Sequence, residues 1–150
     1  MTSFNDSLPM IMHRTLDAVM PKYRELFSKH DLTEQQWRVL RVLWSLGRVT
    51  SVQLAQNTLL PAPSLVGIVD RLEKKALVVR LRSDRDRRVV FVSATPLGKA
   101  LGQEVAPHVD EINKNIQSAV TQQEWDMLQQ TLEKISAYMT EPKIEIVGNV

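Results

Sequence analysis

The chain has 150 residues, of which 43% are hydrophobic, with a formal net charge of +2 and no cysteine. This length suits one ordinary domain, and the lack of cysteine excludes disulfides, thiolate metal sites and cysteine redox chemistry. No run of about 18 apolar residues and no basic leader occurs, so we expect a cytoplasmic protein that neither enters a membrane nor is secreted. The three histidines lack the close helical spacing of a metal site, and neither metal nor cofactor is expected.

The first predicted helix covers residues 8–29, where apolar residues recur at three- and four-residue steps. Pro21 lies inside it and predicts a bend near residues 17–21, because an interior proline removes a backbone hydrogen bond. A second helix begins after Thr33, which has a capping-box partner in Gln36, and ends at Gly47. Its predicted inward residues are Trp37, Leu40, Leu43, Trp44 and Leu46.

Residues 50–75 predict two shorter helices. Thr50 and Gln53 repeat the capping-box pattern. The helix that they open carries Val52, Leu54 and Ala55. The next helix is predicted over Ala62–Lys75, because Pro61 and Pro63 suit a helix start. Its predicted inward residues are Leu65, Ile68, Val69 and Leu72.

The rest of the chain predicts two strands and two helices. The β-branched strands, with a polar connection between them, are Val78–Arg82 and Val89–Ser93. Thr95 and Pro96 open a long helix that contains Pro107, and Thr121 with Glu124 opens the last one. Their apolar stripes are Leu97, Leu101, Val105, Val109, Ile112 and Ile116, then Trp125, Leu128, Leu132, Ile135 and Met139. Residues 141–150 are expected to form a tail.

These elements predict a single domain over residues 1–150, mainly α with a small β-hairpin wing. A winged helix-turn-helix module occupies residues 32–95, and helices in 8–29 and 96–140 flank it. The flanking helices have apolar stripes but little core of their own to cover. We therefore expect them to pair with a second subunit in a two-fold homodimer. The alternative is that they pack only on their own winged module.

Positive charge concentrates between Arg71 and Arg88, a segment that contains eight Lys and Arg residues but only three acidic ones. This segment carries a net +5, whereas the rest of the chain carries −3. Concentrated cations raise the local potential toward polyanions and make association with nucleic acid fast and salt-sensitive. We predict a nucleic-acid-binding surface here, with an ordinary solvated charged face as the alternative.

Several motifs, in this order and spacing, resemble the MarR family of transcriptional regulators over residues 8–140. The motifs are Leu32-Thr33-Glu34-Gln35-Gln36-Trp37-Arg38-Val39-Leu40, Leu54-Ala55, Val69-Asp70-Arg71-Leu72-Glu73, Leu77-Val78-Val79-Arg80, Asp86-Arg87-Arg88, Ala94-Thr95 and Gly98. Together with residues 63–68, the first motif looks most like that of repressors of aromatic-acid catabolism, such as the homoprotocatechuate and hydroxycinnamate types. The resemblance implies a homodimeric DNA-binding repressor that a small-molecule effector releases from a near-palindromic operator.

The resemblance also implies that each subunit lays a recognition helix in the major groove of double-stranded DNA and reaches the minor groove with its wing. Arg88 is the expected minor-groove residue and Asp86 holds the loop, unless the two only stitch the hairpin together. The recognition-helix candidates are Ala62, Pro63, Ser64 and Gly67, and the phosphate candidates are Ser51, Arg71, Lys74, Arg82, Arg85 and Arg87. Many relatives carry Ser and Arg in place of Pro61 and Ala62, so readout is expected to depend on Ser64, thymine methyl groups and groove shape.

Arginines on otherwise apolar helical faces suggest an effector site, which in the family lies between the dimerisation region and the winged module. An aromatic carboxylate could place its ring on Trp37 and its charge on an arginine, which offers two parallel hydrogen bonds. The candidate residues are His13, Arg14, Trp37, Arg38 and Arg41. The alternative is that Trp37 belongs to the core and the arginines form surface ion pairs.

Three other functions make different predictions. A winged-helix interaction module without DNA binding predicts little salt dependence, and a regulator with a non-aromatic effector predicts no response to phenolic acids. A small enzyme would need a lone general base such as His13 or His108. The sequence has no Gly-rich phosphate loop, metal constellation or nucleophile elbow, so we expect that the chain is not an enzyme.

Overall fold

The computed structural model describes residues 7–140, so the predicted tail lies outside the described residues. The elements are α1 (Leu8–Lys29), α2 (Glu34–Leu46), β1 (Val49–Thr50), α3 (Ser51–Thr58), α4 (Ala62–Lys74), β2 (Val78–Arg82), β3 (Val90–Ala94), α5 (Pro96–Gln117) and α6 (Gln122–Thr140). The chain divides into two compact units, Met1–Ile112 with the winged module and Asn113–Val150 with α6. Within residues 7–140, no helix has the length and apolar character needed to cross a bilayer.

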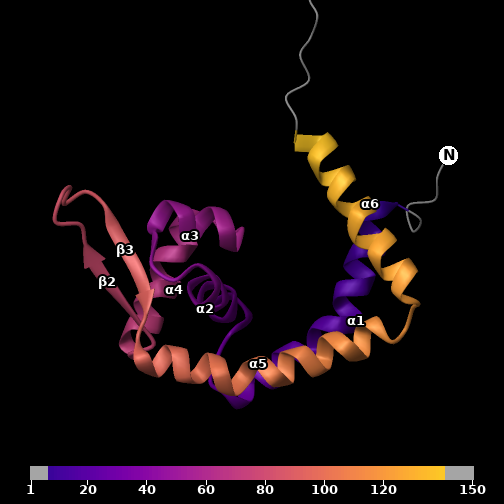
Figure 1. Cartoon of the computed structure of the whole chain (residues 1–150), viewed down its shortest axis with the longest axis horizontal. Coiled ribbons are helices and arrows are strands. Elements are labelled where there is room, and N and C mark those ends of the chain that lie inside the picture. Colours follow the sequence, from indigo (N-terminus) through magenta and orange to yellow (C-terminus); the bar gives the residue numbers. More distant parts are fainter. Residues whose placement is uncertain (1–6, 141–150) are drawn as a thin grey trace, which may run out of the picture. The chain divides into compact units, whose positions relative to one another are not determined.

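The winged module packs around one core to which α1 to α5 and the three strands contribute. Leu40 of α2, Leu54 of α3 and Leu72 of α4 are each 0% exposed. The predicted inward face of α4 is confirmed, because all four of its apolar residues are buried. In Figure 1, α2, α3 and α4 lie together beside the β2–β3 hairpin, and the loop of the hairpin projects beyond them.

Three predicted capping boxes are confirmed. They are Thr33–Gln36 in α2, Thr50–Gln53 in α3 and Thr121–Glu124 in α6. In each box the Thr hydroxyl accepts a hydrogen bond from the N–H three residues on, and that residue's side chain accepts one from the Thr N–H. Two amides that a helix start leaves unpaired are thereby satisfied. Gly47 ends α2, as predicted, with a φ of 72° that glycine adopts without steric cost.

Two helices end in a Schellman motif that uses no glycine. Asp31 after α1 has a φ of 53°, and Ala76 after α4 has a φ of 57°. The residue that follows each of them donates its N–H to the carbonyl five positions back, as the motif requires. A Cβ atom makes this left-handed conformation cost roughly 1–2 kcal/mol. The sequence did not reveal either motif, because glycine is its usual signal.

The predicted hairpin is confirmed, because β2 and β3 pair antiparallel, and a strand that was not predicted, β1, extends the sheet to the order β1-β3-β2. β2 has the predicted bounds, and β3 begins and ends one residue later than predicted. In β1, Val49 pairs with Val92 and Thr50 pairs with Phe91. Two residues are too few to show a periodicity, which is why β1 was missed. Because Thr50 also caps α3, this strand fixes the start of α3 against the wing.

Some apolar residues of the predicted helices are exposed. Leu46, which was predicted to face inward, is 52% exposed, and Val52 and Leu97 have exposed fractions of 67% and 56%. Each lies in the first or last turn of its helix. The ends of these helices extend beyond the core, which covers only their middle turns. The helices α1 and α5 run unbroken through Pro21 and Pro107. The bend near Pro21 stays a prediction, and the proline does not interrupt α1.

The apolar stripe of α6 is not buried within its own compact unit, as far as residues 113–140 describe it. None of its residues is buried, so the predicted inward positions are at most half-buried. Its exposed large apolar residues are Met127, Leu128, Ile135, Tyr138 and Met139. The first half of α1 is similar, with exposed fractions from 40% at Leu8 to 48% at Leu16. The terminal helices thus differ from α2 and α4, whose apolar faces are enclosed.

An aromatic cluster joins α1, α2 and the start of α5. Phe27 stacks on Trp37 with ring centroids 4.8 Å apart, and Trp37 meets Trp44 edge-on at 5.1 Å. The Trp44 indole N–H donates to the Gly98 carbonyl over 2.9 Å. A Cβ atom at Gly98 would lie 2.1 Å from the carbonyl oxygen of Leu77. Only glycine therefore lets α5 approach Leu77, at the start of the wing, this closely.

Candidate nucleic-acid interface

The first half of α4 presents a largely apolar surface. Ala62, Pro63 and Ser64 are exposed, whereas Gly67 is half-buried. Val66, which the sequence prediction omitted, has an exposed fraction of 58%. It lies four residues after Ala62, and this helical spacing could have identified it. The surface offers methyl groups and one hydroxyl, which suit contacts with thymine methyls better than hydrogen bonds to guanine.

The loop of the wing is shaped by two of its own side chains. The Ser83 hydroxyl accepts hydrogen bonds from the N–H groups of Arg85 and Asp86, at 3.2 and 3.4 Å. The Asp86 carboxylate accepts one from the Arg88 N–H at 2.9 Å. Such local bonds are typical of Ser and Asp in tight turns. They fix the backbone that carries the exposed Arg88 side chain.

Arg80 joins the wing to α4. Its guanidinium nitrogen Nη1 lies 2.6 Å from the Asp70 carboxylate and 2.8 Å from that of Glu73. Nη2 donates to the Val66 carbonyl at 3.3 Å, and the Arg80 N–H donates to Glu73 at 3.1 Å. Sequence reasoning counted Arg80 only as one cation of the basic segment. Its partners Asp70 and Glu73 lie one helical turn apart on α4. This spacing could have indicated that the two carboxylates share one cationic partner.

Six of the eight cations in the basic segment remain exposed and without an ion pair among the described residues. Arg80 and Lys75 are the two that are paired, the second with Asp31 at 2.9 Å. The other six are Arg71, Lys74, Arg82, Arg85, Arg87 and Arg88. All six belong to the predicted set of DNA contacts. The predicted Ser51 is also exposed, at the first position of α3.

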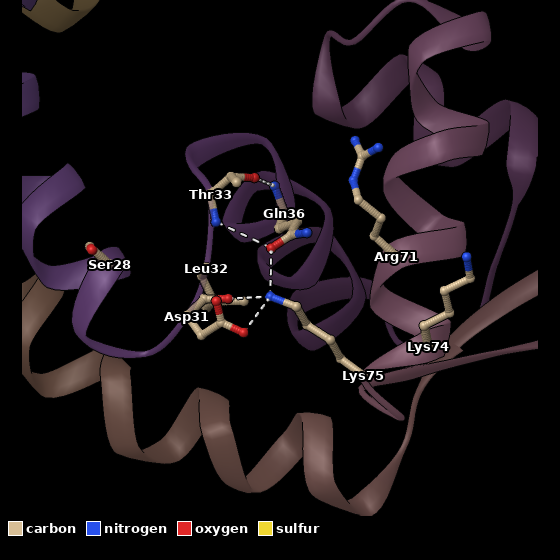
Figure 2. A pocket seen from close by; sticks show the side chains of 8 residues that line it. All are labelled: Ser28, Asp31, Leu32, Thr33, Gln36, Arg71, Lys74 and Lys75. Atoms are coloured by element: carbon tan, nitrogen blue, oxygen red, sulfur yellow. Dashed lines mark hydrogen bonds and ion pairs between the residues drawn. The ribbon is translucent and has the colours of Figure 1, made fainter.

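Lys75 connects the two Schellman turns that end α1 and α4. Its ammonium group donates to the Asp31 backbone carbonyl, pairs with the Asp31 carboxylate and lies 3.4 Å from Gln36 Oε1. Figure 2 shows Lys75 reaching these oxygens across a pocket of about 420 Å³, with Arg71 and Lys74 on the same side as α4. The C-terminal end of α4 is therefore tied to the α1–α2 loop.

The predicted effector residues are not all brought together. Trp37 is 7% exposed and belongs to the aromatic cluster, while His13 and Arg14 lie exposed on α1. Arg38 and Arg41 line a pocket of about 310 Å³ between α2 and the end of α3, whose walls do not include the other three. Arg41 also lies near Tyr23 of α1. Burial raises the pKa of the Tyr23 phenol, and the charge of Arg41 partly opposes this rise.

Within residues 7–140, no cluster of three or more His, Asp or Glu side chains is placed to hold a metal ion. The candidate interface consists of exposed cations and the largely apolar start of α4. Cations hold phosphates, and apolar groups contact the edges of bases.

Comparison with known proteins gives the family. The model described as MarR family matches residues 32–90. The homoprotocatechuate degradative operon repressor of Escherichia coli is 31% identical over 145 residues, which are 97% of this chain and 98% of the repressor. This chain belongs to the MarR family. It is a transcriptional regulator with the winged helix-turn-helix fold that the sequence predicted.

Two solved structures of MarR-family proteins extend the likeness. NadR in complex with 4-hydroxyphenylacetate is 32% identical with a TM-score of 0.77, over 97% of this chain and 99% of that one. A mutant MarR from Escherichia coli, complexed with operator DNA, is 25% identical with a TM-score of 0.80, over 90% of this chain and 99% of that one. Relatives of this chain thus include a protein bound to an aromatic acid and one bound to an operator.

Proposed function

We propose that this MarR-family regulator is a cytoplasmic, homodimeric repressor that binds operator DNA and releases it when an aromatic acid binds. The proposal is carried by six exposed cations, on the wing and at the end of α4, that have no ion pair among residues 7–140. In this arrangement α4 enters the major groove, Arg88 enters the minor groove, and the other cations contact phosphates. The role of the chain is regulatory rather than catalytic.

The uncovered apolar faces of α1 and α6 support the homodimer. Apolar patches of this extent on a soluble protein mark interaction sites, and a two-fold pair of identical chains is the commonest way to cover them. Sedimentation or light scattering at several protein concentrations tests this, with a dimer as the expected species. A protein that remains monomeric at all concentrations would remove the basis for two recognition helices on one operator.

A titration of DNA from the gene's own upstream region tests operator binding. A dimer making about 6–10 phosphate contacts should lose roughly 10³–10⁵ in affinity between 50 and 200 mM salt. Arg88→Ala should weaken binding by about 10- to 100-fold while the dimer stays intact. Lys99→Ala, which removes an exposed cation from α5, is the matched control and should change little. Salt-independent binding to a protein partner would instead support the interaction module.

For the effector, we propose a hydroxylated phenylacetic acid or a related aromatic carboxylate. The names of the similar repressor and of the NadR complex support this class. In this chain, Arg41 is available to bind the carboxylate, beside Tyr23 and the aromatic cluster. An effector shifts the regulator only by its different affinity for the DNA-competent and incompetent states, so its binding must also weaken when operator is bound.

Thermal shift and operator release with 4-hydroxyphenylacetate test the effector class. Tyrosol, which keeps the hydroxylated ring but has an alcohol in place of the carboxylate, is the matched ligand and should have little effect. Arg41→Met should reduce the response to the acid more than Arg38→Met does. A regulator that answers to no aromatic acid but to another class of compound would support the non-aromatic alternative.

A further inference from the structure

The pocket in Figure 2 lies between the α1–α2 loop and the last turns of α4, and the effector proposal does not use it. Three cations line its α4 side, namely Arg71, Lys74 and Lys75, whereas Asp31 is the only acidic residue that lines it. Because Lys75 and Asp31 pair with each other, they neutralise each other. The charge that faces the pocket is therefore that of Arg71 and Lys74, for which the described residues provide no counter-ion.

Gln36 supplies a donor from the floor of this pocket. Gln36 as a whole is 2% exposed. Its Oε1 accepts hydrogen bonds from the Thr33 N–H at 3.2 Å and from the Lys75 ammonium at 3.4 Å. Its Nε2 has no hydrogen-bond partner among the described residues. Figure 2 shows this nitrogen turned toward the side on which α4 lies. Because no fully buried side-chain nitrogen or oxygen among the described residues lacks a hydrogen-bond partner, this nitrogen reaches solvent and is open to a ligand acceptor.

We propose that this pocket binds a small oxyanion, the phosphate or carboxylate group of an anionic metabolite. Three donors of this lining are available to the anion: the guanidinium of Arg71, the ammonium of Lys74 and the amide N–H of Gln36. A guanidinium beside an ammonium suits planar or tetrahedral oxyanions. The donors line a hollow of about 420 Å³ rather than a convex surface, which favours a small molecule over the backbone of a duplex.

Anion binding in this pocket weakens operator binding, a consequence that depends on the proposed function. Arg71 and Lys74 are two of the six cations assigned to phosphate contacts, so an anion that pairs with them removes charge from the DNA-binding surface. By linkage, operator DNA then lowers the affinity for the anion by the same factor. The anion binding itself does not require DNA and can be measured without it.

The first experiment measures the melting temperature of the full chain against inorganic phosphate, at fixed pH and ionic strength. Specific binding predicts a saturable rise of a few degrees. Phosphate also stabilises proteins by exclusion from their surfaces, but that rise does not saturate and is common to all variants. The double variant Arg71→Met/Lys74→Met should lose the saturable part. Lys99→Met/Lys114→Met removes the same charge from α5 and should keep it.

Gln36→Glu gives an independent test, because glutamate preserves the capping box with Thr33 and replaces the amide donor by an anion. This variant should also lose the saturable rise while its melting temperature in chloride shows that it is folded. A rise that never saturates, or that is equal in all variants, would overturn the proposal. So would an Arg71→Met/Lys74→Met variant that changes only the salt dependence of DNA binding, since those cations would then serve DNA phosphates alone.

Discussion

The helices α2 and α6 carry similar apolar stripes but bury them to opposite extents. On α2, Leu40 is 0% exposed, whereas Leu128 of α6 is 48% exposed. The stripe of α2 faces a core to which seven other elements contribute, whereas no residue of α6 is buried in the described part of its own unit. A helical periodicity therefore shows that a face will be covered, but it does not show whether the same chain covers it.

Leucine truncations sharpen this comparison most. Leu40→Ala should cost about 2–5 kcal/mol of unfolding free energy at every protein concentration, because it leaves a cavity in the core. Leu128→Ala should have a small effect on the isolated chain and should act by weakening the dimer, so its effect should grow as the protein is diluted. Urea unfolding at two concentrations measures both. Equal, concentration-independent losses would contradict the distinction between the two regions.

Gly98→Ala probes how tightly the winged module is closed by α5. The added Cβ would lie 2.1 Å from the Leu77 carbonyl oxygen, so the helix must shift and the cost should be about 1–3 kcal/mol. Gly67→Ala is the control, because its Cβ would meet only the end of the Arg71 side chain at 3.6 Å. Thermal unfolding of the two variants compares them. A Gly98→Ala protein as stable as the wild type would show that α5 is loosely attached.

Ala76→Gly should stabilise the winged module by about 1 kcal/mol, since it relieves the left-handed strain in the Schellman turn after α4. Ala100→Gly is the matched control in the interior of α5, and it should destabilise by a similar amount. Opposite shifts in melting temperature are therefore expected from the same chemical change. Two shifts of the same sign would show that the turn does not hold Ala76 in this conformation.

The smallest expected effect concerns the caps of α3 and α6, which share one geometry but differ in charge. Hydrogen bonds from Thr121 lower the pKa of Glu124 below 4.5. The cap therefore contributes fully above pH 4.5 and is lost as the pH falls through the lower, folded value. Gln53, which caps α3, does not titrate. Lowering the pH from 6 to 3 should loosen the first turn of α6 but not that of α3, and amide hydrogen exchange measures this. In the Glu124→Gln variant, the two first turns should respond alike to the fall in pH.

Local chemistry predicted much of the winged module from the sequence. The bounds of β2, the start of α4 and all three capping boxes depend on residues within a few positions of one another, and each was confirmed. The sequence also predicted the exposed cations of the wing, from the concentration of charge, and the exposed residues in the first half of α4, from helical spacing. Their contacts with DNA remain predictions.

Non-local features were missed. β1 is recognised only through its pairing with β3, and the three contacts of Arg80 with α4 depend on the hairpin folding back. The left-handed Asp31 and Ala76 lack the glycine that signals such turns. Trp37 was predicted both as an inward residue and as an effector contact. Only the structure shows that Trp37 is 7% exposed and packs between Phe27 of the core and the partly buried Trp44.

The Arg80 contacts have a mechanical consequence. One guanidinium holds two partly exposed carboxylates and a carbonyl of α4, so a hairpin that swings away from that helix must break all three contacts. These contacts favour movement of the hairpin together with the helix. We expect induction to change the distance between two such pieces, one in each subunit, and so to release both grooves of a half-site together.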